Sequence, residues 1–141
     1  MPFKKLFRSA EKPSDGLSQV ARQAIVDALH YCMYADKHIA ASEDAFIETA
    51  ARTLNWDPKI SYEYYEGKST AAAREALSDQ AATELFFESL RSRLTKDSDR
   101  ELVIRLAGDL VKSDGRATAG EATTVARLRS ALAPKRPNKV E

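Results

Sequence analysis

Acidic residues flank two short breaks in the helical pattern of the chain. In YADKHIAASEDAFIETA, six residues separate Asp36 from Glu43, and in VKSDGRATAGEATTVARL the same spacing separates Asp114 from Glu121. Each aspartate is placed to end one helix, and each glutamate is placed to begin the next. Carboxylate oxygens, together with backbone carbonyls and water, are the ligands that Ca²⁺ and Mg²⁺ prefer. The four side chains are therefore candidate ligands of a divalent cation.

Helix capping is an alternative explanation for the two glutamates. The segment 118–121, Thr-Ala-Gly-Glu, has the form of a capping box, in which the hydroxyl and the carboxylate satisfy free backbone N–H groups. At the first junction, 40–43 lacks the hydroxyl unless the cap shifts to Ser42. The helix dipole disfavours the aspartates, and only Asp114 is explained by an Asp-Gly turn. Capping and cation binding both remain open for these acids.

Helices must position these junctions, because no useful length of the chain alternates apolar and polar residues with period two. We therefore predict an all-α fold, a single-domain helical bundle of about six to seven helices. The predicted helices cover 13–35, 41–55, 61–66, 71–77, 79–94, a segment that begins at residue 97 or 98, and 119–133. Ser14 and Ser78 are candidate N-caps for the first and the fifth of them. Pro58 and Gly67 limit the third to a short segment.

The two junctions belong to a weak internal repeat. Aligning 34–54 with 112–132 matches the aspartates, the glutamates, one alanine and one leucine, and pairs Ile47 with Val125. The matched positions are the junction acids and the apolar stripe of the following helix. The alignment therefore predicts two pseudo-repeated helix hairpins within the bundle.

The apolar stripes predict which side chains form the core. Val20 and Cys32 fall on the inner face of the first helix, Leu85 falls on the inner face of 79–94, and Trp56 is expected to cover the core. In SYEYYEGK, the three tyrosines of 62–65 cannot all face the core from one helix, so at least one is expected at the surface. They would form either a partner surface or a packed cluster whose hydroxyls reach water.

Length and composition favour one cytoplasmic domain. The chain has 141 residues, of which 43% are hydrophobic and 30% are charged, as is usual for a globular protein. No apolar run approaches the roughly 20 residues of a membrane-spanning helix, and basic residues interrupt the N-terminal apolar residues where a signal peptide would be continuous. The single cysteine excludes an internal disulfide, which favours a reducing compartment.

The net charge of +1 is unevenly distributed. Residues 1–12 carry +3 and residues 134–141 carry +2, which leaves −4 for 13–133. We expect the two ends to be flexible basic tails, and we expect no nucleic-acid site on the acidic body, because phosphate binding needs clustered Lys and Arg. The segment 3–8 combines apolar and basic residues, so it is a candidate for peripheral contact with the inner membrane face.

The two junctions resemble the TerB-like family, which is named for a bacterial tellurite-resistance protein. The family pattern is a helix that ends in Ala-Asp-Gly, then an apolar residue and a few small residues, then a glutamate that opens the next helix. The segment 35–39 followed by Glu43 is similar to this pattern, and so is 113–117 followed by Glu121. The resemblance covers roughly residues 17–132, and in the first copy Lys37 replaces the glycine.

The resemblance implies that 13–133 is a duplicated all-helical TerB-like domain with an acidic metal-binding surface. It implies that Asp36, Glu43, Asp114 and Glu121 are ligands of a divalent cation, Ca²⁺ or Mg²⁺, and that the protein engages protein partners in a stress response near a membrane. The chain shows no coherent catalytic set, zinc-ligand spacing or phosphate-binding loop, so we expect a protein that is not an enzyme. The alternative is a metal-independent helical adaptor or scaffold whose junction acids only cap helices.

Overall fold

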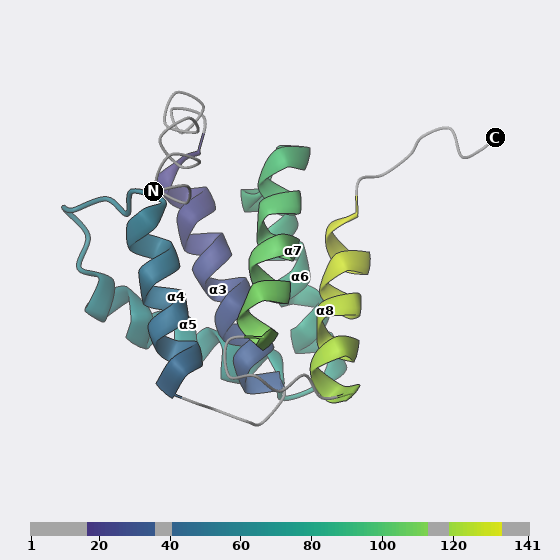
Figure 1. Cartoon of the computed structure of the whole chain (residues 1–141). Coiled ribbons are helices and arrows are strands. Elements are labelled where there is room, and N and C mark those ends of the chain that lie inside the picture. Colours follow the sequence, from purple (N-terminus) through teal and green to yellow (C-terminus); the bar gives the residue numbers. More distant parts are fainter. Residues whose placement is uncertain (1–16, 36–40, 113–118, 134–141) are drawn as a thin grey trace.

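The computed structural model describes residues 17–35, 41–112 and 119–133, without the side chains of 41–42 and 119–122. This part of the chain contains six helices and no strand, which confirms the all-α single-domain bundle. The helices are α3 (Gln19–Ala35), α4 (Ala41–Thr53), α5 (Tyr62–Ala76), α6 (Gln80–Arg93), α7 (Asp97–Lys112) and α8 (Ala119–Leu132) (Figure 1). The predicted tails 1–12 and 134–141 lie outside the described residues.

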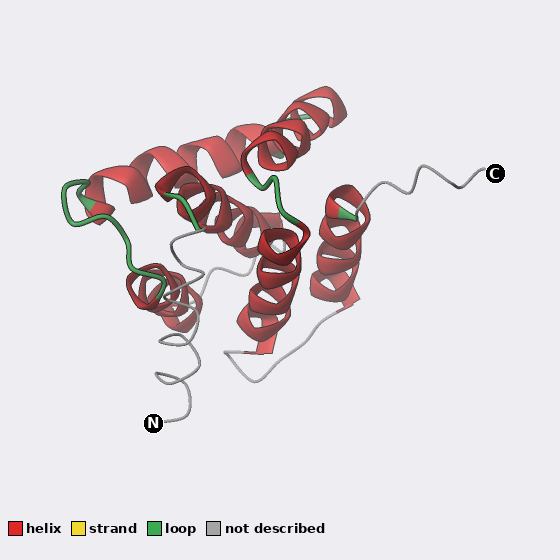
Figure 2. Cartoon of the chain, turned by 90° about the horizontal axis from the view of Figure 1, so that it is seen from above, coloured by secondary structure: helices red, strands yellow, loops and turns green. Residues whose placement is uncertain are grey.

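Helix α3 is the centre of the bundle. It contacts each of the other five helices, with α4 and α5 on one side and α6, α7 and α8 on the other (Figure 1). Seen from above, some helices are viewed along their axes and others from the side, so the helices do not all run parallel (Figure 2). Every residue from Ala24 to Met33 is buried, including Asp27 and His30. A helix enclosed on all sides has no polar face, so these two groups must find partners inside the protein.

No helix in the described ranges is both long enough and apolar enough to cross a bilayer.

The core around α3 is built from the inner faces of the surrounding helices. Its aromatic part includes Tyr31, which lies 5.3 Å from Phe86 and 5.4 Å from Phe87 between ring centroids. Cys32 and Trp56 are buried as the sequence predicts, and Trp56 Nε1 donates to the carbonyl of Ile60 over 2.8 Å.

The two helix hairpins of the predicted repeat are formed by α3 with α4 and by α7 with α8, and the helices of each pair are in contact. The matched positions Ile47 and Val125 are both buried, and so are the matched leucines Leu54 and Leu132. The connecting segments 36–40 and 113–118 lie outside the described residues. The apolar register of the repeat is therefore present in the structure.

Three predicted helix boundaries are wrong. The segments 61–66 and 71–77 form one helix, α5, because a glycine inside a helix costs only about 0.5–1 kcal/mol and a buried stripe continues past Gly67 on both sides. Helix α3 begins at Gln19 because Ser18 Oγ accepts from the N–H of Ala21 over 3.0 Å, while Ser14 lies outside the described residues. Asp79 caps α6, since its Oδ1 accepts from the N–H of Ala82 over 2.7 Å.

Two predicted core residues lie at the surface. Leu85 is 67% exposed and Val20 is 49% exposed. In α6 the inner face carries Phe87 in place of Leu85, because Phe86, Phe87 and Leu90 are the residues that turn toward the core. Apolar residues on both flanks of a stripe leave its orientation uncertain by one residue, and packing against Tyr31 decides it.

Candidate metal centre

Of the four acids predicted to bind a cation, only one side chain belongs to the described part of the chain. Asp36 and Asp114 lie outside it, and Glu121 is in the first turn of α8 with its side chain not described. Glu43 is in the first turn of α4 and is 1% exposed. Burial, and secondarily the charge of Glu43, raises the pKa of the Cys32 thiol to about 12. Glu43 therefore faces the interior beside α3.

A different group of metal-ligating side chains lies between α3, α4 and α5. A ring nitrogen of His30, a carboxylate oxygen of Asp44 and a carboxylate oxygen of Glu66 all lie within 4.8 Å of one another. Bonds of about 2.0–2.2 Å place opposite ligands about 4 Å apart, so small side-chain shifts would bring these three atoms around one ion. Each residue comes from a different helix, and α3 contacts both α4 and α5. We call this group the His30 centre.

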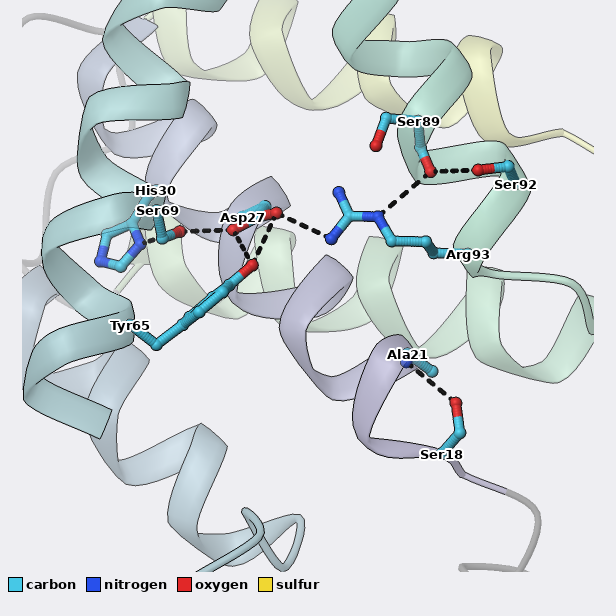
Figure 3. Close-up of polar contacts among 9 residues, drawn as sticks. All are labelled: Ser18, Ala21, Asp27, His30, Tyr65, Ser69, Ser89, Ser92 and Arg93. Atoms are coloured by element: carbon cyan, nitrogen blue, oxygen red, sulfur yellow. Dashed lines mark hydrogen bonds and ion pairs between the residues drawn. The ribbon is translucent and has the colours of Figure 1, made fainter. Parts of the chain in front are cut away.

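A hydrogen-bond relay holds the ring of His30 from the other side. Its Nδ1 lies 2.9 Å from Ser69 Oγ, and Ser69 Oγ in turn donates to Asp27 Oδ1 over 2.6 Å (Figure 3). Asp27 also accepts from the hydroxyl of Tyr65, at 2.9 and 3.0 Å, and pairs with Arg93 Nη1 at 2.9 Å. Figure 3 shows the second ring nitrogen of His30 turned away from this relay. Because Nδ1 is used by Ser69, Nε2 is the nitrogen left for an ion.

Two buried polar atoms at the His30 centre have no hydrogen-bond partner among the described residues. They are Nε2 of His30 and the hydroxyl of Tyr62. Burial raises the pKa of Tyr62, and the charges of Glu66, Asp44 and Glu48 raise it further, which places this hydroxyl beside the acidic part of the centre. A buried polar atom without a partner costs about 1–3 kcal/mol. A bound ion with its water would satisfy both atoms.

The protonation states at the centre suit a metal ligand set. Burial lowers the pKa of His30 to about 4, and the charge of Asp44 offsets this only in part, so the imidazole is neutral at pH 7. Burial raises the pKa of Glu66 to about 7, assisted by a hydrogen bond that its protonated carboxyl group donates to Asp44 and by the charges of Asp44, Glu48 and Glu63. A neutral imidazole binds a metal, and a cation would displace the proton that crowded carboxylates retain.

Neither His30, Asp44 nor Glu66 was identified from the sequence as a ligand. They are far apart in the chain and follow no fixed spacing, because each lies on a separate helix. The one usable signal was His30 itself, together with Asp27, inside the apolar run AIVDALHYCM. A polar residue in such a run must be satisfied within the fold. The partners that satisfy it are set by tertiary packing.

No family model matches the chain, and no curated protein or solved structure matches it significantly. The resemblance to the TerB-like family depends on the two junction motifs alone. The function of the His30 centre has to be argued from its own geometry.

Proposed function

We propose that this protein is a non-enzymatic helical domain that binds a divalent cation at the His30 centre. The supporting observation is that His30 Nε2 is buried without a partner within the described part of the chain, on a ring of which one nitrogen lies within 4.8 Å of carboxylate oxygens of Asp44 and Glu66. One imidazole and two carboxylates supply three ligands, and water or the nearby hydroxyl of Tyr62 can complete the shell. Such a donor set suits Zn²⁺, Mn²⁺ or Fe²⁺ better than Ca²⁺.

Binding at this place would stabilise the fold. The cation would reduce the repulsion between the carboxylates of Asp44 and Glu66, and it would join α3, α4 and α5 through one set of bonds. A ligand that binds only the folded state stabilises it by about 2.7 kcal/mol at one hundred times its dissociation constant. The expected consequence is a melting temperature that rises with metal concentration.

The resemblance to the TerB-like family adds a biological role to this proposal. It adds a stress-response role of the tellurite-resistance type, with a protein partner near the cytoplasmic face of a membrane. It also proposes a second cation site for Ca²⁺ or Mg²⁺ at Asp36, Glu43, Asp114 and Glu121. Only the Glu43 side chain of this set is described, and it is buried. The junction site is therefore tested separately from the His30 centre.

A metal-independent helical adaptor is the second candidate function. The exposed side chains of Tyr64 and Leu85, 70% and 67% accessible, favour it, because large apolar groups at the surface are typical of protein interfaces. Tyr64 is the exposed one of the three tyrosines in 62–65, which confirms that at least one of them lies at the surface. The hydroxyl of Tyr62 is buried, and the hydroxyl of Tyr65 donates to Asp27.

Calorimetric titration of metal-free protein with Zn²⁺, Mn²⁺, Ca²⁺ and Mg²⁺ tests the proposal. We expect saturable binding of one transition-metal ion, at least tenfold weaker in Glu66→Gln. The matched control is Glu75→Gln, an exposed acid of the same helix, which should bind like the wild type. An Asp114→Asn/Glu121→Gln variant tests the junction acids in the same experiment. The metal proposal would be wrong if the wild type shows no saturable binding, or if Glu66→Gln binds equally well.

A further inference from the structure

The relay behind His30 begins at a buried carboxylate that can only accept hydrogen bonds. Asp27 is 5% exposed and receives donors from three side chains: Ser69, Tyr65 and Arg93. The guanidinium of Arg93 lies 2.9 Å from Oδ2, and this fixed positive charge favours the ionised form of the carboxyl group. An ionised carboxylate has no hydrogen to donate. The hydrogen between Ser69 and Asp27 must therefore come from Ser69.

This assignment fixes the proton on His30. A serine hydroxyl has one hydrogen, and Ser69 uses it on Asp27 Oδ1 over 2.6 Å. Its lone pair then faces Nδ1 of His30 at 2.9 Å. If Nδ1 also carried a lone pair, the two would repel each other, so Nδ1 carries the hydrogen. A neutral imidazole has a single N–H, and Nε2 is left with a lone pair.

The position of this proton determines what the other ring nitrogen, Nε2, can bind. One ring nitrogen of His30 lies within 4.8 Å of carboxylate oxygens of Asp44 and Glu66. Because Nδ1 is engaged by Ser69, we assign Nε2 to this group, where it offers an electron pair and no hydrogen. No described residue supplies a hydrogen to Nε2. Three converging electron-pair donors, one of them nitrogen, form a site that suits a cation and disfavours an anion.

We infer that Ser69 and Asp27 are positioning residues that hold His30 with its proton on Nδ1, and that they thereby make the His30 centre select a transition-metal cation over Ca²⁺ and Mg²⁺. The inference rests on the proposed function, because it assumes that the centre binds a metal. It adds the residues that set the preference for a transition metal. The selectivity depends on the nitrogen ligand, since a site of carboxylates alone favours the hard cations.

The first part of the test reads the tautomer without any metal. Nitrogen-15 NMR of the imidazole in the presence of EDTA at pH 7 distinguishes a protonated from an unprotonated ring nitrogen. The chain has two histidines, so a His38→Gln variant leaves His30 as the one signal. We expect a protonated Nδ1 and an unprotonated Nε2. The opposite tautomer would overturn the inference even if the protein binds metal.

The second part measures selectivity in Ser69→Ala, which removes the hydroxyl from a position buried at 1% exposure. We expect Zn²⁺ affinity to fall about 10–100-fold, as when an outer-shell partner of a histidine ligand is removed. Affinity for Mg²⁺ should hardly change, so the ratio of the two affinities falls. The control is Ser92→Ala, whose exposed hydroxyl donates to the carbonyl of Ser89. An unchanged ratio in a folded Ser69→Ala protein would overturn the inference.

The two proposals fail in different ways. The expected tautomer together with no metal binding by the wild type would overturn the proposed function and, with it, the selectivity. Zn²⁺ binding with the opposite tautomer would overturn the role of Ser69 and Asp27 alone. A Ser69→Thr variant keeps a hydroxyl at this position and should retain both the tautomer and the Zn²⁺ preference.

Discussion

Arg93 Nη1 lies 2.9 Å from Asp27 Oδ2 and joins the last turn of α6 to the middle of α3. Asp27 would otherwise be a charge enclosed by helices on all sides. Arg93 also donates from Nε to the carbonyl of Ser89 over 3.3 Å, so the guanidinium is held by its own helix as well. Burial raises the pKa of Asp27, whereas the hydrogen bond from Ser69 and the charge of Arg93 act in the opposite direction.

Replacement of Arg93 by methionine should therefore destabilise the protein by about 3 kcal/mol, because it leaves Asp27 buried without its cation. Urea unfolding followed by circular dichroism measures the change. The control is Arg52→Met, which removes an exposed pair with Glu48 and should leave the unfolding midpoint nearly unchanged. Equal midpoints for Arg93→Met and the wild type would contradict an ionised Asp27 in the core.

His30 should make metal-free protein lose stability in mild acid. Its pKa is about 4 in the folded protein against an ordinary value of 6.5, so the unfolded chain binds the proton more readily. The contribution of the neutral ring to the free energy of unfolding is complete above pH 6.5 and is lost as the pH falls to about 4. A pKa shift of this size corresponds to about 3 kcal/mol. Urea midpoints between pH 7 and pH 4.5 in EDTA measure it.

The comparison that isolates His30 uses His30→Gln, because Asp27 and Glu66 also titrate and their raised pKa values act with the opposite sign. The difference in stability between wild type and His30→Gln should shrink as the pH falls from 6.5 toward 4. His38→Gln should keep a constant difference from the wild type. A constant difference for His30→Gln as well would show that the ring titrates normally.

Leu90 and Leu85 test the orientation of α6. Leu90 is fully buried and Leu85 is 67% exposed, although the sequence pattern assigns both to the inner face. Leu90→Ala should cost about 2–5 kcal/mol through lost burial and a cavity, whereas Leu85→Ala should change stability by less than about 0.5 kcal/mol. Thermal and urea unfolding measure both variants. Similar losses for the two would mean that α6 is turned toward the predicted face.

The sequence predicts the fold better than it predicts the orientation of individual helices. Helical periodicity and the junction repeat identify the all-α bundle, the two hairpins and most of the core, including Ile47 and Val125. Periodicity could not separate Leu85 from Phe87, because both flank the same stripe and contact with Tyr31 decides between them. Helix boundaries also depended on which of two neighbouring polar residues acts as cap, as at Ser78 and Asp79.

The sequence pattern does not predict the His30 centre, for a different reason. Amphipathic patterns assume that a helix has one buried face, whereas α3 is enclosed by five helices and buries its polar residues as well. Such patterns therefore make no prediction that Asp27 and His30 are buried. Their partners Ser69, Glu66 and Arg93 come from helices whose positions around α3 no local pattern specifies.

Gly67 lies inside α5, and a Cβ built there meets no atom within 4 Å. Gly67→Ala should therefore raise stability by about 0.5–1 kcal/mol, because alanine loses less backbone entropy when the helix forms. Gly108→Ala, in the interior of α7 with equally open space, should behave in the same way. Thermal melting measures both. A loss of stability in Gly67→Ala would indicate that α5 is interrupted at this residue.

The enclosure of α3 also determines how the single cysteine reacts. Cys32 is 3% exposed, and burial raises the pKa of its thiol to about 12, so hardly any reactive thiolate exists at neutral pH in the folded protein. A thiol reagent can reach the sulfur only when the helices around α3 separate. The rate of labelling under native conditions therefore reports how often the helices around α3 open.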